Sequence, residues 1–275
     1  MRHNGGSLVG EDAKEGEPQE RPQPWVGHFH EANGPFHVFV GGSPQRPGDE
    51  VAPASSSFLA ETTRRYDLAS NSPEHLRRYA LAQWIVDPRN PLTWRSIVNR
   101  VWHYHFGRGI VESPNDFGRM GAKPTHPELL DWLAAGFRDG NQSIKELHRL
   151  IVTSSVYRQT SASDERQSRR DGGNRFLWRA NRRRLDAESI RDSVLAVSGK
   201  LSPSMYGPGF DSFAFIDDHS PHYLYDRQDV DDPRTWRRSV YSFIVRSVPD
   251  PFMETLDCPD PSMNVPVRNQ TITAL

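Results

Sequence analysis

A series of helix-start and helix-stop signals between residues 72 and 199 limits the folds open to this chain. Asn90-Pro91 is the clearest start, because asparagine caps a helix end and proline suits the first helical position. Gly107 is the matching stop, since glycine readily adopts the left-handed conformation that closes a helix. The sequence therefore predicts a helix over residues 91–106.

Four further helices are predicted from signals of the same kind. Thr125-His-Pro-Glu128 and Ser143-Ile-Lys-Glu146 have capping-box spacing, in which a hydroxyl and a carboxylate satisfy two free amides reciprocally. Gly140 and Gly199 stand just past two of the helix ends. The predicted helices cover residues 73–84, 126–139, 144–152 and 186–198. Ser72, Thr125 and Ser143 are the predicted caps of the first three, and the fourth begins at Asp186.

Strand signals are few. Residues 35–40 suit one short strand that ends at Gly41-Gly42, and residues 44–57 resemble a loop rich in proline, glycine and serine. Beyond residue 200 long loops are expected, and residues 239–245 are the best strand candidate because they are β-branched and aromatic. The predicted fold is mainly α, with antiparallel helices, a minor β element and long C-terminal loops.

Length and composition favour one domain. The chain has 275 residues, and we predict a disordered leader over residues 1–35 and a single domain over residues 36–275. The single cysteine, Cys258, excludes an internal disulfide, a cysteine-based zinc site and a haem attachment motif. No apolar run is long enough for a membrane span or a signal peptide, so the chain as written is expected to be cytoplasmic.

Charge gives little indication of a nucleic-acid partner. The formal net charge is −1, although residues 166–184 contain eight arginines. Such a run can bind phosphates. Here the acidic residues nearby and the aspartates of residues 217–232 offer internal partners instead. We therefore expect no nucleic-acid partner.

Two histidines on the predicted helix 91–106 invite a metal interpretation. His103 and His105 are two residues apart, so they project about 200° apart on a helix and cannot share one ion. The alternative is that His105 is a hydrogen-bonded core residue and that His103 binds a loop carbonyl. His103 lies on the same helix face as Asn99. No spacing rule supports a metal set, and the metal content stays unknown.

Two more polar residues follow closely. Asp116 could act as a general base, although Asx residues before glycine commonly form turns by bonding their own backbone. His126 lies at the start of a predicted helix, where the helix dipole favours a neutral ring. Asp116, His103 and His126 are therefore the candidate catalytic residues. No phosphate-binding loop, nucleophile elbow or His-Glu-x-x-His motif is present.

Many short motifs recur in the order found in a planctomycete-specific domain family of unknown function, which the chain resembles over residues 36–275. The motifs are Leu81-Ala-Gln-Trp84, Asn90-Pro-Leu-Thr93, Val98-Asn-Arg-Val-Trp102, Phe106-Gly-Arg-Gly109, Pro114-Asn-Asp-Phe-Gly118, Thr125-His-Pro-Glu-Leu-Leu-Asp-Trp132, Leu147-His-Arg-Leu-Ile151, Ser155-Val-Tyr-Arg-Gln159, Leu177-Trp-Arg-Ala-Asn-Arg-Arg-Arg-Leu185 and Arg237-Arg-Ser-Val-Tyr241.

The resemblance implies a domain arrangement for the larger protein, but it implies no catalysed reaction. Such domains usually form the C-terminal part of large exported proteins, downstream of another uncharacterised domain and often of a cytochrome c-like haem module. It therefore implies no cofactor within this chain, and haem only through an upstream partner module. The chain departs from the family at Gly41-Gly42-Ser43, where an Arg-Gly-Asp-like triplet is common, and at Val265, where a cysteine is common. It also looks shortened at both ends.

Two functional hypotheses follow. The first is a structural or interaction domain that docks against an upstream redox module. The second is a hydrolase or other enzyme acting on extracellular polysaccharide, including sulfated forms, with Asp116, His103 and His126 as its working groups.

Overall fold

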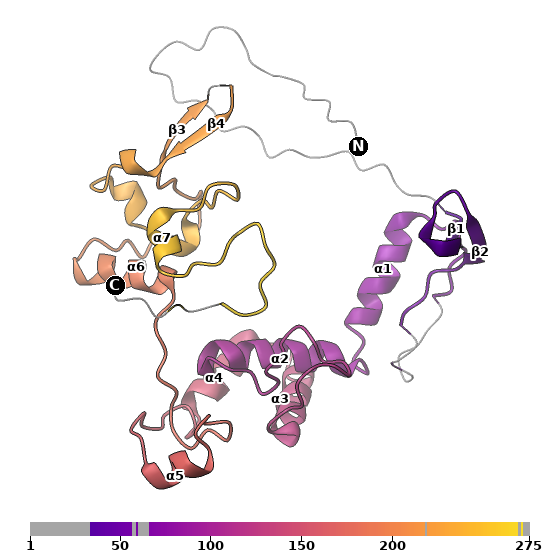
Figure 1. Cartoon of the computed structure of the whole chain (residues 1–275), viewed down its shortest axis with the longest axis horizontal. Coiled ribbons are helices and arrows are strands. Elements are labelled where there is room, and N and C mark those ends of the chain that lie inside the picture. Colours follow the sequence, from indigo (N-terminus) through magenta and orange to yellow (C-terminus); the bar gives the residue numbers. More distant parts are fainter. Residues whose placement is uncertain (1–33, 57–58, 60–65, 218, 269–270, 272–275) are drawn as a thin grey trace. The chain divides into compact units, whose positions relative to one another are not determined.

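The computed structural model describes residues 34–56, 59, 66–217, 219–268 and 271 (Figure 1). All but two residues of the predicted leader 1–35 lie outside this set. The chain divides into two compact units, Met1–Ile85 and Val86–Leu275. Within the described residues, seven α-helices and two small antiparallel sheets confirm a mainly α fold with a minor β element.

The first unit contains one two-stranded sheet and one helix. Strand β1 (Phe36–Phe39) pairs antiparallel with β2 (Pro47–Val51), with Phe36 opposite Val51. The prediction of a strand ending at Gly41-Gly42 is confirmed. The prediction of a loop over residues 44–57 was wrong for β2, because strand pairing with β1 satisfies its backbone despite two turn-forming residues. Helix α1 (Glu74–Ile85) begins one residue past Pro73.

Three helices form the core of the second unit. Helices α2 (Pro91–Phe106), α3 (Pro127–Asp139) and α4 (Ile144–Thr153) have the predicted bounds to within a residue or two. The Asn90 side chain accepts a hydrogen bond from the Leu92 amide, and Gly107 closes α2 in the left-handed conformation at φ 77°. Their apolar faces bury twelve residues together: Trp94, Val98, Trp102, Phe106, Ile110, Val111, Leu130, Leu133, Ala134, Phe137, Leu147 and Ile151.

Two helices follow this core. The short helix α5 (Glu165–Arg170) lies in the arginine run and was not predicted. It is capped by Asp164, and Glu165 pairs with Arg169 one turn later. Helix α6 (Ala187–Val197) is capped by Asp186, where the predicted helix begins, and Gly199 has a positive φ of 74° just past its end. No helix in the described ranges is long and apolar enough to cross a membrane.

The C-terminal part differs most from expectation. Strands β3 (Ala214–Asp217) and β4 (Pro221–Leu224) form a hairpin where a loop was predicted. The strand predicted over residues 239–245 was wrong, because the 3-10 helix η4 (Ser239–Tyr241) begins there. Its residues bond to α6 and to residue 210 instead of to a neighbouring strand. Helix α7 (Pro251–Thr255), capped by Asp250, was not predicted.

Candidate functional site

Asn99 is the buried polar centre of the region that the sequence singles out. Its side chain is fully buried on α2 and binds the backbone of Val111 at both ends. Nδ2 donates to the Val111 carbonyl at 2.9 Å, and Oδ1 accepts from the Val111 amide at 2.8 Å. A Cβ on Gly109 would lie 2.8 Å from both of these Asn99 atoms, so only glycine fits there. Asn99 therefore holds the loop after α2 against the helix.

His103 lies one turn further along α2 and is half-buried. Its Nδ1 is buried and has no hydrogen-bond partner, so the predicted bond of His103 to a loop carbonyl is not formed at this atom. Burial lowers the pKa of His103 below its ordinary value of 6.5, and the positive charges of Arg183 and Arg100 lower it further. Both effects favour the neutral form of the ring.

His105 lies two residues beyond His103 on α2 and has a different set of contacts. It contacts His148 of α4, with Nε2 and Nδ1 2.6 Å apart, and its ring meets the edge of Tyr157. Burial, then the neighbouring His148, lowers the pKa of His105. The predicted hydrogen bond of His105 is confirmed, with an imidazole as the partner, but the predicted core position was wrong, because His105 is only partly buried beside the exposed His148. Within the described part of the chain, no group of three or more His, Cys, Asp or Glu could hold a metal.

Acidification is expected to destabilise the fold through these two histidines. A lowered folded-state pKa means that the unfolded chain binds more protons near pH 6.5. Stability is then fully present above pH 6.5 and falls as the pH drops through that value. Urea unfolding at several pH values between about 5.5 and 7.5 measures this slope. The double variant His103→Gln/His105→Gln should flatten it, whereas the exposed His222→Gln should not; equal slopes would contradict the prediction.

Asp116 forms a turn in the loop between α2 and α3. Its Oδ1 accepts from the Gly118 amide at 2.8 Å, and its backbone carbonyl accepts from the Ser113 hydroxyl. Gly121 packs directly against the Asp116 carbonyl, where a Cβ would meet the oxygen at 2.1 Å. The alternative that Asp116 is a turn former is thus confirmed, and the residue is exposed.

His126, not Thr125, is the residue before α3. The predicted capping box at Thr125 was wrong, because His126 occupies the cap position and its side chain makes no cap hydrogen bond. Thr125 Oγ1 instead lies 2.9 Å from His126 Nδ1 and 3.4 Å from the Ile110 carbonyl. The Thr125 amide also donates to that carbonyl, which ties the residue to the preceding loop. The His126 ring meets the edge of Phe176.

The three predicted catalytic residues are not joined to one another. Among the described residues, no hydrogen bond or ion pair connects Asp116, His103 and His126. None of them lines the cavity described below. A catalytic role for these three residues stays a prediction.

A cavity of 620 Å³ lies elsewhere, among α6, η4 and α7. Carboxylates and arginines line part of the cavity. Apolar side chains line another part, together with the chain's single thiol. The charged lining residues are Asp186, Glu188, Asp192, Asp250, Glu254, Arg238 and Arg268, and the apolar ones include Val240, Phe243, Ile244, Val245, Met253 and Cys258.

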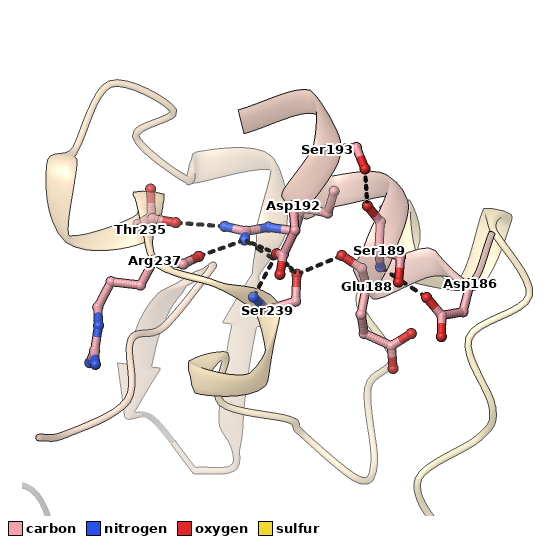
Figure 2. Close-up of polar contacts among 9 residues, drawn as sticks. Asp186, Glu188, Ser189, Asp192, Ser193, Thr235, Arg237 and Ser239 are labelled. Carbon is pink, nitrogen blue, oxygen red and sulfur yellow. Dashed lines mark hydrogen bonds and ion pairs between the residues drawn. The ribbon is translucent and has the colours of Figure 1, made fainter. Parts of the chain in front are cut away.

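Polar contacts join α6 to η4 (Figure 2), and Asp192 and Ser239, which make two of them, also line the cavity. Asp192 accepts from both the amide and the hydroxyl of Ser239 at 2.7 Å. Ser239 is buried, and its hydroxyl also lies 3.3 Å from the Glu188 carbonyl. Arg191 donates to the carbonyls of Thr235 and Arg237, at 2.6 and 3.0 Å. These bonds fix the chain after residue 234 against α6.

The C-terminal segment also contributes to the cavity lining, through Cys258 and Arg268. Arg268 donates two hydrogen bonds to the Glu188 carboxylate, at 2.5 and 2.8 Å, which hold the pKa of Glu188 below its usual value. Cys258 lies next to this pair, with Sγ 3.9 Å from Glu188 Oε1, and burial raises the pKa of its thiol. Asp257 accepts from Thr271 and pairs with Arg184 at 3.1 Å. Sequence reasoning missed this cavity because no local motif marks contacts between residues 70 to 80 positions apart.

The family comparison agrees in part with the resemblance, since it too gives a domain of unknown function. The family described as PSD1, protein of unknown function (DUF1553), matches residues 77–275. Neither the curated proteins nor the solved structures include a match to the chain. Since the matched residues make up more than half of the sequence, the chain belongs to the PSD1 (DUF1553) family.

Proposed function

We propose that the chain is a non-catalytic structural or interaction domain of a larger exported protein that contains a cytochrome c-like haem module. The supporting observation is the cavity between α6, η4 and α7, whose apolar lining is open to solvent. Val240, Phe243 and Ile244 expose 73%, 51% and 62% of their surface there. Contiguous exposed apolar side chains beside polar ones are typical of sites that bind another protein.

Binding to the haem module is the direct test. Titration of the purified chain with the cytochrome c-like module of a longer, similar protein should give a dissociation constant of about 10 μM or below by calorimetry. Phe243→Asp should weaken the binding about tenfold or more, because a buried carboxylate would lose its hydration in the interface.

The matched control is Met120→Asp, since Met120 is 90% exposed and lies outside the cavity. Met120→Asp should bind as the unchanged chain does. Absence of binding at about 1 mM of the module, or equal weakening by the two variants, would contradict the proposal.

An enzyme acting on extracellular polysaccharide, including sulfated forms, is the second candidate. The observation in its favour is His103, whose lowered pKa and unpartnered Nδ1 suit a general base. Asp116 and His126 would be its partners in this function. Release of reducing ends by the purified protein, lost in Asp116→Ala, would establish it.

A further inference from the structure

The cavity combines an apolar floor with an excess of negative charge. Five carboxylates line it, from Asp186, Glu188, Asp192, Asp250 and Glu254. Only two guanidinium groups lie among the lining residues. Arg191 does not line the cavity but lies 3.8 Å from Asp192, which does. Since desolvated carboxylates require a positive partner, such a lining favours a cationic occupant over an anionic one.

The carboxylates differ in how far they are already neutralised. Glu188 receives both guanidinium nitrogens of Arg268, and Asp192 binds Ser239 and lies 3.8 Å from Arg191. On the α7 side, Asp250 accepts from two backbone amides and a serine hydroxyl. Glu254 has no ion pair with any residue that the structure describes. Negative charge is therefore least compensated beside α7.

Arg268 shows what this lining can accommodate. A guanidinium group from the C-terminal segment lies against Glu188, with Asp186 at 4.0 Å. The same arginine lines the cavity together with apolar residues such as Met253 and Val245. A cation from a distant segment of the chain thus already lies against the carboxylates of this lining.

We infer that the cavity binds an extended segment of a partner protein in which a lysine or arginine stands between apolar residues. The apolar side chains pack on Val240, Phe243 and Ile244, and the cation lies against Glu254 and Asp250. This inference rests on the proposed interaction function and specifies the chemistry of the partner segment.

Short peptides test it on the full chain. Cys258 is the chain's single cysteine and lines the cavity, so its alkylation by iodoacetamide reports occupancy. N-acetyl-leucyl-lysyl-leucinamide should slow the alkylation, with a dissociation constant of about 1 mM or below. The glutamyl peptide of the same design should bind about tenfold more weakly or not at all, because its charge matches that of the lining.

Two variants with matched controls locate the contacts. Glu254→Gln should weaken lysyl-peptide binding about threefold, as expected for an exposed ion pair, whereas Glu112→Gln should not. Phe243→Ala should weaken it about tenfold, whereas Met120→Ala should not. Higher salt should reduce the preference for the lysyl peptide. Because Glu254 is exposed and caps no helix, its variant tests the inference even if Phe243→Ala fails to fold.

Equal protection of Cys258 by both peptides, no protection by either, or unchanged binding in Glu254→Gln would overturn the inference. Binding of the lysyl peptide without binding of the haem module would leave the cavity assignment standing and remove the proposed cytochrome partner. Binding of the haem module without binding of the lysyl peptide would support the proposed cytochrome partner and overturn the assignment of the cavity to a lysyl or arginyl segment.

Discussion

Replacing Trp102 with alanine is expected to lower the free energy of unfolding by about 4 kcal/mol. The indole on α2 is 4% exposed and stacks on Phe106, with ring centroids 4.2 Å apart. It belongs to the apolar cluster that joins α2, α3 and α4. Truncation removes the buried area and leaves a cavity that the surrounding helices can only partly close. Urea unfolding followed by circular dichroism measures the change.

Trp132 provides the matched control. This tryptophan lies on α3 but is 60% exposed, so Trp132→Ala should cost less than about 1 kcal/mol. Because both variants replace tryptophan with alanine, the difference between their unfolding free energies reports the effect of burial alone. Similar costs for the two variants would show that α2 does not pack as the structure describes.

Replacing Asn99 with leucine is expected to lower the free energy of unfolding by about 3 kcal/mol. Leucine has the same branched arrangement of side-chain heavy atoms but can neither donate to the Val111 carbonyl nor accept from its amide. Both backbone groups belong to a residue that is 2% exposed, so water does not replace the lost partner. Each unsatisfied buried group costs about 1–3 kcal/mol.

The control for Asn99→Leu is Asn115→Ala in the following loop. Asn115 is exposed, and its side chain accepts from Arg100 at the surface, so its loss should cost about 0.5 kcal/mol or less. Asn99→Leu should also raise the rate of proteolysis in the loop over residues 107–111, because that loop is held by Asn99. A stable Asn99→Leu protein with an unchanged proteolysis rate would refute this role.

The starts of three longer helices could be predicted from caps that use neighbouring residues, whereas the short helices α5 and α7 have such caps and were not predicted. Asn90, Ser143 and Asp186 each bond a backbone amide two or three residues ahead, and all three helices begin as predicted. Thr125 has the same spacing but failed. Its hydroxyl and amide meet the Ile110 carbonyl, fifteen residues earlier in the chain, and that contact is not encoded by a local motif.

The strand predictions failed for a related reason. The propensity of residues 239–245 for a strand is strong, yet the buried Ser239 bonds to Asp192, 47 residues away, and the backbone turns into a 3-10 helix. Conversely, residues 47–51 and 221–224 have turn-forming residues but pair with strands that satisfy their backbones. Strand formation depends on a partner more than on the segment itself.

For the candidate site, the sequence alone indicated the region of Asn99, His103 and Asp116, and helical spacing correctly separated His103 from His105. The sequence by itself determined the mainly α class and the starts of α2, α4 and α6, because their cap hydrogen bonds span only a few residues. Tertiary structure decided that Asn99 is the buried anchor, that His105 pairs with His148, and that a cavity forms beside α6. The reason is distance along the chain: Glu188 and Arg268 are 80 residues apart, and only folding brings the two charges within hydrogen-bond reach.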